Sequence, residues 1–162
     1  MPDRPHIDIR VTSWERDGAA LGAIRREVFV FEQGVPEDIE WDGQDTACAH
    51  VIALANREPV GTGRLLPTGK IGRLAVLAPF RRHGVGRAML ARLVDLARER
   101  GLREVYLHAQ VSALGFYTAY GFVAEGPEFE EAGIVHRRLR LVLAEAPVAA
   151  DQRSSAAPAR DP

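Results

Sequence analysis

The sequence predicts a mixed α/β domain in which the sheet is mainly antiparallel and contains one parallel junction. Three strand-like segments between residues 49 and 77 are joined by short turns, which is the pattern of an antiparallel meander. The third of these strands is followed by a helix and another strand, and such a crossover makes its two strands parallel. We therefore expect the element order β-α-β-β-β-α-β-α-β-β.

The elements before the meander are a strand and a helix. Apolar and polar residues alternate over residues 6–12, as they do in a half-buried strand. Apolar residues then recur at helical spacing over residues 18–31, and Ser13 or Asp17 is expected to cap this helix. Residues 37–45 are rich in carboxylates and show no period, so their composition favours a solvated acidic loop.

The meander and its crossover occupy the centre of the chain. Runs of apolar residues, separated by turns that contain glycine or proline, predict strands over residues 49–55, 60–66 and 70–77. Apolar positions at helical spacing predict a helix over residues 85–100. The residue after this helix is a glycine, which suits a left-handed C-cap.

Four more elements of regular structure are predicted after the crossover helix, in the last third of the chain. An apolar segment follows the crossover helix, and a short aromatic helix comes next, capped by Ser112 and closed by a glycine. Glutamate-rich residues then interrupt the apolar pattern, and we expect a loop there. The expected segments are a strand at 104–109, a helix from Ser112 to Tyr120, a strand at 122–125, a loop at 126–133 and a strand at 135–143.

Length and composition indicate a single globular domain. The chain has 162 residues, of which 46% are hydrophobic and 27% charged, and this is enough to build a substantial core. We place the domain at residues 1–145. Residues 146–162 consist mainly of Ala, Pro, Ser and Arg without periodicity, so we expect a disordered tail.

Charge and cysteine content exclude several classes of function. The formal net charge is −1, so no overall basic field favours nucleic acid. Cys48 is the only cysteine, which excludes an intramolecular disulfide and a metal–thiolate site and fits a reducing compartment. No apolar window approaches the length that crosses a bilayer. We expect a cytoplasmic protein with no membrane, nucleic-acid or metal partner.

A glycine-rich segment joins the third meander strand to the helix at 85–100. Gly84 and Gly86 allow a sharp turn, so that several peptide N–H groups can point to one place. A helix N-terminus built in this way binds phosphate. Arg81, Arg82 and Arg87 add positive charge that suits a diphosphate. The alternative is a tight turn with solvated arginines, and these residues alone do not decide between the two interpretations.

Two motifs together suggest a family. The segment Arg81-x-x-Gly84-x-Gly86 is followed, one crossover later, by Phe116-Tyr117-x-x-Tyr120-Gly121-Phe122. This combination resembles the GNAT superfamily of acetyl-CoA-dependent N-acetyltransferases. The resemblance extends over residues 7–143 and is closest to the ElaA-like subgroup, through the segments Val28-Phe29-Val30-Phe31-Glu32-Gln33, Ile71-Gly72-Arg73, Val105-Tyr106-Leu107-His108-Ala109-Gln110 and Glu131-Ala132-Gly133-Ile134-Val135-His136.

The resemblance implies an acetyl-CoA site and direct acetyl transfer to a primary amine of a small molecule or peptide. It implies helices on both faces of the sheet, parallel strands that splay apart to admit pantetheine, and membership of a superfamily in which homodimers are common. The cofactor-binding residues implied are Leu74, Ala75 and Val76 on the strand, Arg81, Arg82, His83, Gly84, Val85, Gly86 and Arg87 in the phosphate loop, and Gln110 and Ser112 beside the pantetheine amides.

Acetyl transfer from a thioester needs three kinds of group. A backbone N–H near Val76 is a candidate for stabilising the oxyanion. Tyr117 is the candidate general acid for the leaving thiolate, although an aromatic residue on such a helix can also be a core residue. The acceptor ammonium must lose a proton, and Glu32 and His136 are tentative bases, with His108 as a third. Each histidine has a purely structural role as its alternative.

Two other functions compete with this interpretation. A non-catalytic acyl-CoA-binding sensor on the same fold would keep the phosphate loop and acetylate nothing, and Tyr117 argues against it. A Rossmann or P-loop nucleotide-binding protein is disfavoured, because no Gly-x-Gly-x-x-Gly follows the first strand and no Gly-Lys-Ser/Thr occurs. The acceptor itself is not identified, but four carboxylates are candidates for attracting a cationic amine: Glu37, Asp38, Glu40 and Asp42.

Overall fold

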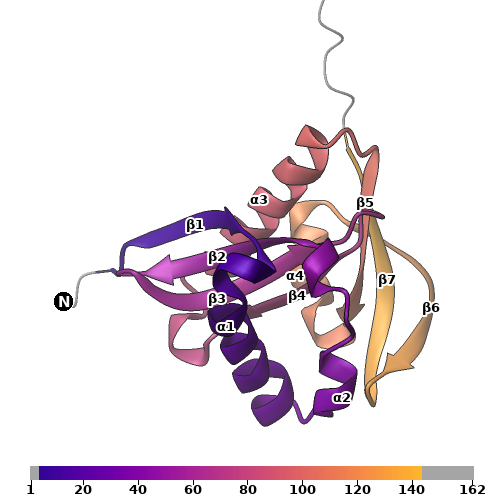
Figure 1. Cartoon of the computed structure of the whole chain (residues 1–162). Helices are drawn as coiled ribbons and strands as arrows, with labels where there is room; N and C mark the ends of the chain where they lie inside the picture. Colours follow the sequence, from indigo (N-terminus) through magenta and orange to yellow (C-terminus); the bar gives the residue numbers. More distant parts are fainter. Residues whose placement is uncertain (1–3, 144–162) are drawn as a thin grey trace, which may run out of the picture.

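The computed structural model describes residues 4–143 of the chain (Figure 1). None of the helices within that range is long and apolar enough to span a membrane. The elements are β1 (Ile7–Thr12), α1 (Trp14–Arg25), the π-helix η1 (Arg26–Glu32), α2 (Glu37–Glu40), β2 (Ala49–Ala55), β3 (Glu58–Leu65), β4 (Ile71–Val76), α3 (Val85–Glu99), β5 (Glu104–Gln110), α4 (Leu114–Tyr120), β6 (Val123–Glu131) and β7 (Ile134–Val142). Short 3₁₀ turns lie at Asp45–Ala47, Ala78–Phe80 and Val111–Ala113. The predicted order of the strands and of the three longer helical segments is confirmed, whereas the predicted tail at 146–162 lies outside the described residues.

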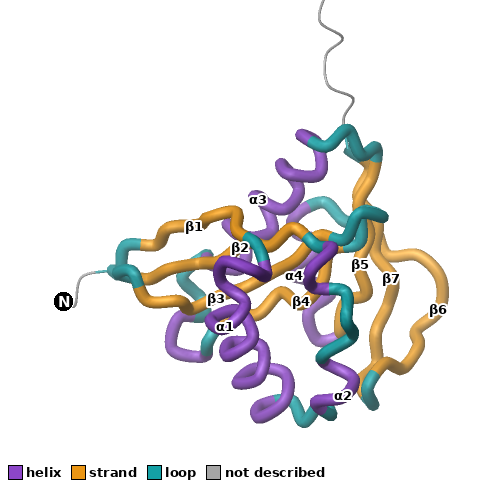
Figure 2. The backbone as a smooth tube through the Cα atoms, viewed as in Figure 1, coloured by secondary structure: helices purple, strands orange, loops and turns teal. Residues whose placement is uncertain are grey.

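The strands form two antiparallel sheets that part from a common point. One sheet has the order β1-β2-β3-β4 and the other β5-β7-β6. Among the described residues, the sheets are joined by a parallel bridge between Lys70 and Tyr106, where the Tyr106 N–H donates to the Gly69 carbonyl at 3.1 Å. Beyond this bridge the strands of the two sheets run in different directions (Figure 2). The predicted parallel, splayed junction is therefore confirmed.

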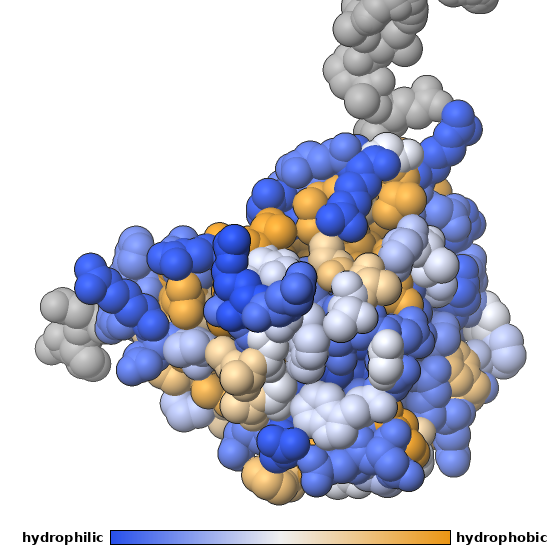
Figure 3. Space-filling model, viewed as in Figure 1, coloured by the Kyte–Doolittle hydropathy of each residue, from blue (hydrophilic) through white to orange (hydrophobic). Residues whose placement is uncertain are grey.

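Helices cover both faces of the first sheet, as predicted. A Cβ atom on Gly61 would lie 2.8 Å from Met89 Cε, and one on Gly63 would lie 3.0 Å from Leu93 Cδ1. These glycines of β3 therefore let α3 approach the sheet closely. Arg64, the residue after Gly63, points to the opposite face, because side chains alternate along a strand, and α1 packs there. The view in Figure 3 shows a mostly hydrophilic surface with hydrophobic residues gathered near α3.

The first helix differs in two ways from its prediction. It begins at Trp14 rather than residue 18, because the Ser13 side chain accepts a 3.1 Å hydrogen bond from the Arg16 N–H and caps it. The other predicted cap, Asp17, lies inside the helix and accepts from the Thr12 hydroxyl at 2.5 Å. The second half is a π-helix, a geometry common at functional sites, and it ends at Glu32.

Three predictions on the loops were wrong. Ser112 does not cap α4, because a 3₁₀ turn precedes that helix and Ala113 occupies the cap position. The expected loop at 126–133 is instead the second half of β6, which pairs with β7 after a register shift between Glu125 and Phe129. The hairpin turns only afterwards, at Ala132 and Gly133, both with positive φ. The acidic segment at 37–45 contains α2 and buried carboxylates, which belong to the site described next.

Candidate active site

A cavity of about 470 Å³ opens between β4 and β5, where the two sheets part. It is lined from several directions: β4 and β5 form its walls, the segment around α2 lies on one side, and the tip of the β6–β7 hairpin lies on the other. The residues that line it include Phe29, Gln33, Val35, Ile39, Lys70, His108, Gln110, Tyr117, Glu131 and His136. The cavity thus joins the predicted acid, Tyr117, to two predicted bases, His136 and His108.

The glycine-rich segment forms an exposed turn into α3 with an open helix N-terminus. Gly84 is the N-cap of α3 in the left-handed conformation, with φ of 79°, and no side chain caps the helix. The N–H groups of the first turn are therefore free of a side-chain cap. Arg82, His83 and Arg87 are exposed around this turn. A Cβ atom on Gly86 would lie 3.4 Å from the Phe116 ring, so α4 packs directly against the turn.

Arg81 differs from its neighbours, because its guanidinium is already hydrogen-bonded to other groups of the protein. It donates to both carboxylate oxygens of Glu32 at 2.6 and 2.8 Å, and its Nε donates to the Val76 carbonyl at 2.8 Å. A hydrogen bond from Arg81 lowers the pKa of Glu32. A carboxylate held by a guanidinium is a weak proton acceptor, so these contacts argue against Glu32 as the base. They favour a role for Arg81 in positioning the turn rather than in binding phosphate.

The C-terminal end of β4 presents backbone groups to the gap. The Leu77 N–H donates to the Val60 carbonyl of β3 at 2.9 Å. Because successive N–H groups of a strand point in opposite directions, the Val76 N–H faces away from β3, toward the gap between the sheets. The Val76 carbonyl oxygen already accepts a hydrogen bond from Arg81. Among the described residues, no group competes for the Val76 N–H, which faces the cavity side.

Tyr117 lies on α4 and reaches the cavity from the side of the turn. Its ring packs edge-to-face against Phe116 and Phe122, with centroids 5.0 and 6.0 Å apart. Burial raises the pKa of the Tyr117 phenol to about 12. The phenol is therefore protonated at neutral pH and is a hydrogen-bond donor beside the cavity.

Two histidines, His108 and His136, also line the cavity. His136 on β7 is 8% exposed, stacks on Phe129 and bonds through Nδ1 to the Ile134 carbonyl at 2.7 Å. His108 on β5 bonds through Nδ1 to the Glu131 carboxylate at 2.7 Å. In the neutral form of each ring, Nδ1 carries the proton and Nε2 is the acceptor. Both predicted histidines therefore offer an acceptor nitrogen, and Glu131 is a partner that the sequence placed in a loop.

The two remaining cofactor candidates occupy different positions. The Gln110 amide donates to the Gln33 amide oxygen at 2.7 Å, so this pair joins the end of β5 to the end of η1 across the cavity wall. Ser112 is exposed in the 3₁₀ turn before α4 and does not line the cavity. Sequence reasoning missed Gln33, because its partner lies 77 residues away along the chain.

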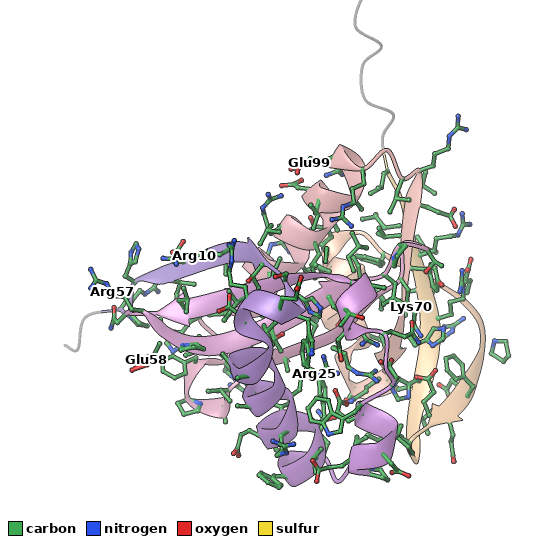
Figure 4. All side chains as sticks on the ribbon, viewed as in Figure 1. Arg10, Arg25, Arg57, Glu58, Lys70 and Glu99 are labelled. Carbon is green, nitrogen blue, oxygen red and sulfur yellow. The ribbon has the colours of Figure 1, made fainter. Side chains whose placement is uncertain are left out.

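A buried ionic network holds the segment that carries α2 against the cavity. Arg25 is fully buried and extends from α1 toward this segment (Figure 4), where it donates to Glu40 at 2.8 Å and to Asp45 at 2.6 Å. Arg64 of β3 binds Asp45 at 2.9 Å and also Asp42. The prediction of a solvated acidic loop was therefore wrong. Helical periodicity could not reveal it, since Arg25 looks like an ordinary polar position in the sequence.

This network also changes the electrostatics of the four carboxylates expected to attract an amine. Burial alone would raise the pKa of Asp42, but hydrogen bonds from Arg64 and the Gln44 N–H outweigh it and lower that pKa to about 2. Glu40 is neutralised by Arg25, and Glu37 pairs with Arg26 at 2.9 Å. Only Asp38 of the four has no ion pair to another described residue. In residues 4–143 no group of three or more His, Cys, Asp or Glu side chains could hold a metal ion.

Comparison with known proteins identifies which proteins the sequence and the fold resemble. Residues 15–143 match the family model described as "Acetyltransferase (GNAT) domain". The chain is 40% identical over 136 residues to YyaT of Bacillus subtilis, covering 80% of this chain and 92% of that protein. It is 31% identical to ElaA of Escherichia coli, covering 72% and 82% respectively. A crystal structure of an acyl-CoA N-acyltransferase from Pseudomonas aeruginosa superposes with a TM-score of 0.74 at 30% identity, covering 83% of this chain and 99% of that one.

Proposed function

We propose that this chain, which belongs to the GNAT acetyltransferase family, transfers an acetyl group from acetyl-CoA directly to a primary amine of a small molecule or peptide. One observation carries the proposal. Tyr117 lines the cavity between β4 and β5, and its neighbour Phe116 packs against Gly86 in the uncapped first turn of α3. A candidate proton donor at the cavity and a turn suited to a diphosphate therefore lie close together, which supports the proposal.

The turn before α3 fits the diphosphate of coenzyme A. Left-handed Gly84 turns the backbone so that the first N–H groups of a 15-residue helix face outward, and the positive end of the helix dipole lies there. Exposed Arg82, His83 and Arg87 surround it, and Val85 and Gly86 supply further N–H groups. Arg81 acts indirectly, by fixing this turn to Glu32 and to the end of β4.

The edge of β4 fits an extended pantetheine arm. Leu74, Ala75 and Val76 lie where the two sheets separate, so backbone groups on this edge are not used by β5. The Val76 N–H is the donor we assign to the oxyanion. Removing one preorganised donor of this kind reduces turnover by about 10²–10³-fold.

Tyr117 is the general acid of the proposed reaction. Acetyl-CoA, as a substrate, supplies the activated acyl thioester, and its leaving thiolate must be protonated. Burial keeps the Tyr117 phenol protonated, so the donor is present over the physiological range. Desolvation in the same cavity raises the proton affinity of a thiolate as well, which favours transfer from the phenol.

The acceptor side of the cavity is partly apolar. Phe29, Val35 and Ile39 approach it from η1 and the segment around α2, and Lys70 and Glu131 contribute charge at its margin. Its volume of about 470 Å³ admits a small amine or the end of a peptide. These features favour an amine on an apolar carrier, and 2-phenylethylamine is a suitable first probe.

The test has a binding arm and a transfer arm. Acetyl-CoA should raise the melting temperature, while NAD and ATP should leave it unchanged. Thiol release from acetyl-CoA is then followed with 2-phenylethylamine, glycinamide and a hexapeptide with a free N-terminus. Binding without release with any primary amine would favour the non-catalytic sensor, and no shift with acetyl-CoA would refute the cofactor assignment.

A further inference from the structure

His108 and Glu131 form a pair that spans a strand. His108 lies on β5 and Glu131 on β6, and β7 lies between these two strands in the sheet. Their side chains meet above β7, with Nδ1 of His108 2.7 Å from Oε1 of Glu131. The register places Arg138 of β7 directly opposite His108. The Glu131 carboxylate therefore reaches the His108 imidazole from β6, which is separated from β5 by β7.

The pair is held in a fixed orientation by an aromatic ring. Phe129 packs edge-to-face on His108, with centroids 5.0 Å apart and an interplanar angle of 79°. The register shift in β6 places Phe129 opposite His136, which leaves Glu131 at the tip of the hairpin. Orientation by Phe129 and the Glu131 hydrogen bond fixes Nδ1 as the proton-bearing nitrogen, so the lone pair of a neutral His108 ring lies on Nε2.

His108 is better suited than His136 to accept a proton. Both line the cavity with Tyr117. The partner of His136 is a neutral backbone carbonyl, whereas the partner of His108 is a carboxylate. A carboxylate stabilises the positive charge that an imidazole acquires on protonation, because the hydrogen bond then joins two opposite charges. The His108 side chain is also 23% exposed, so that protons can pass to solvent.

We propose that His108 is the base that deprotonates the acceptor amine and that Glu131 is its positioning residue. This assignment rests on the proposed function and names the group that completes it. Nε2 takes one proton from the ammonium, and the amine nitrogen then forms a bond to the acyl carbon. The carbon–sulfur bond breaks, and Tyr117 gives its proton to the thiolate. The phenolate regains a proton from the former amine nitrogen, and His108 releases the first proton to solvent.

The surroundings of the pair are mixed in charge. Every neighbouring element contributes charged or titratable groups near His108 or around its cavity. Their positive and negative charges are balanced, so neither sign dominates. The groups are Glu131 on β6, His136 and Arg138 on β7, Tyr106 on β5, Tyr117 on α4, Lys70 and Arg73 beside the β4 edge, and Glu40 and Asp42 near α2. Arg138 lies over the Tyr106 ring and pairs with Glu125, so Glu131 is the carboxylate that His108 contacts directly.

The first test needs no acceptor. Long-range ¹H–¹⁵N NMR on the isolated full-length protein, above the pH at which the imidazoles are protonated, distinguishes the two neutral tautomers. The His108 signal is identified by its loss in His108→Gln. We expect the Nδ1–H tautomer. An Nε2–H tautomer would overturn the proposal whatever the protein acetylates, because the acceptor nitrogen would then face Glu131.

The second test measures thiol release from acetyl-CoA with 2-phenylethylamine. His108→Gln should lower kcat by about 10²-fold or more with acetyl-CoA binding retained. Glu131→Gln should lower kcat by at least about 10-fold with little change in KM, and Glu131→Asp should restore part of the loss. Added imidazole should partly rescue His108→Ala, which a purely structural role of His108 would not allow.

A matched control is available on the same strand. Glu125 on β6 pairs with Arg138 and Arg140 and does not contact His108, so Glu125→Gln should keep wild-type kcat. Wild-type turnover in His108→Gln, or a larger loss in His136→Gln than in His108→Gln, would overturn the assignment of the base. A wild-type protein that acetylates none of the probe amines would instead refute the proposed function, and this proposal with it.

Discussion

The guanidinium of Arg81 donates hydrogen bonds to both carboxylate oxygens of Glu32, at 2.6 and 2.8 Å. These residues lie 49 positions apart along the chain. Glu32 ends the π-helix η1, and Arg81 begins the turn that precedes α3. Since Arg81 also donates to the Val76 carbonyl, one side chain fixes the turn to both η1 and the end of β4.

Loss of this clamp should weaken acetyl-CoA binding without removing a catalytic group. Glu32→Gln frees one side of Arg81 and loosens the turn, so Kd for acetyl-CoA should rise several-fold while kcat stays within about 3-fold of wild type. Kd is measured by calorimetry and kcat by thiol release at saturating substrates. A kcat loss of about 10²-fold or more would restore Glu32 as the base.

Left-handed Gly84 provides a second test of the phosphate turn. Gly84→Ala forces a side chain into a conformation that costs about 1–2 kcal/mol, and the turn should relax away from its binding geometry. We expect Kd for acetyl-CoA to rise more than about 10-fold. Gly101→Ala is the matched control, because Gly101 has a similar φ of 77° just beyond the other end of α3. Equal effects of the two substitutions on Kd would contradict a diphosphate site at Gly84.

The buried network should dominate the stability of the α2 segment. Arg25→Met removes the buried partner that Glu40 and Asp45 share, leaving Glu40 with Arg73 and Asp45 with Arg64, and breaking a buried ion pair costs about 3–5 kcal/mol. Urea unfolding measures the loss. Arg10→Met is the surface control, since the Arg10–Asp8 pair is exposed and should contribute less than about 1 kcal/mol. A loss below about 1 kcal/mol in Arg25→Met would show that the network is not structurally required.

Asp42 predicts a specific dependence of stability on pH. Its pKa is lowered to about 2 in the folded protein, compared with about 4 for an unfolded chain. The folded state therefore binds fewer protons than the unfolded state between these values, so the stabilisation is complete above pH 4 and is lost as pH falls toward 2. Urea unfolding across this window should show a smaller pH dependence in Asp42→Asn than in wild type. Identical slopes would contradict the role of the Arg64 contact.

The sequence predicts most of the framework and much less of the site. Alternation, continuous apolar runs and helical spacing locate β1, β2, α3 and β7 to within a few residues, because these segments carry regular apolar patterns. Those patterns cannot show that Arg25 is buried, since its compensating charges come from a segment with no period at all. The apolar pattern also does not reveal that β6 continues through the glutamate-rich segment. That segment has low strand propensity and is stabilised by its backbone pairing with β7.

Candidate site residues can be singled out from the sequence where a single local motif contains them, and not where two distant residues form a pair. Local motifs single out Tyr117 and the turn at Gly84, and the structure packs α4, which carries Tyr117, against that turn. Glu32 and Arg81 were both assigned to chemistry, yet they neutralise each other. His108 could not be distinguished from other histidines, because Glu131 reaches it only through the folding of three strands into one sheet.

The most direct test of the proposed acetyl transfer is a comparison of wild type with Tyr117→Phe in two assays on the same preparations. The phenol is predicted to act on the leaving thiolate and not on binding. We expect Kd for acetyl-CoA to stay within about 2-fold, while kcat for thiol release at saturating 2-phenylethylamine falls by about 10²-fold. Unchanged kcat in Tyr117→Phe would contradict the account, and so would a wild-type protein that does not bind acetyl-CoA.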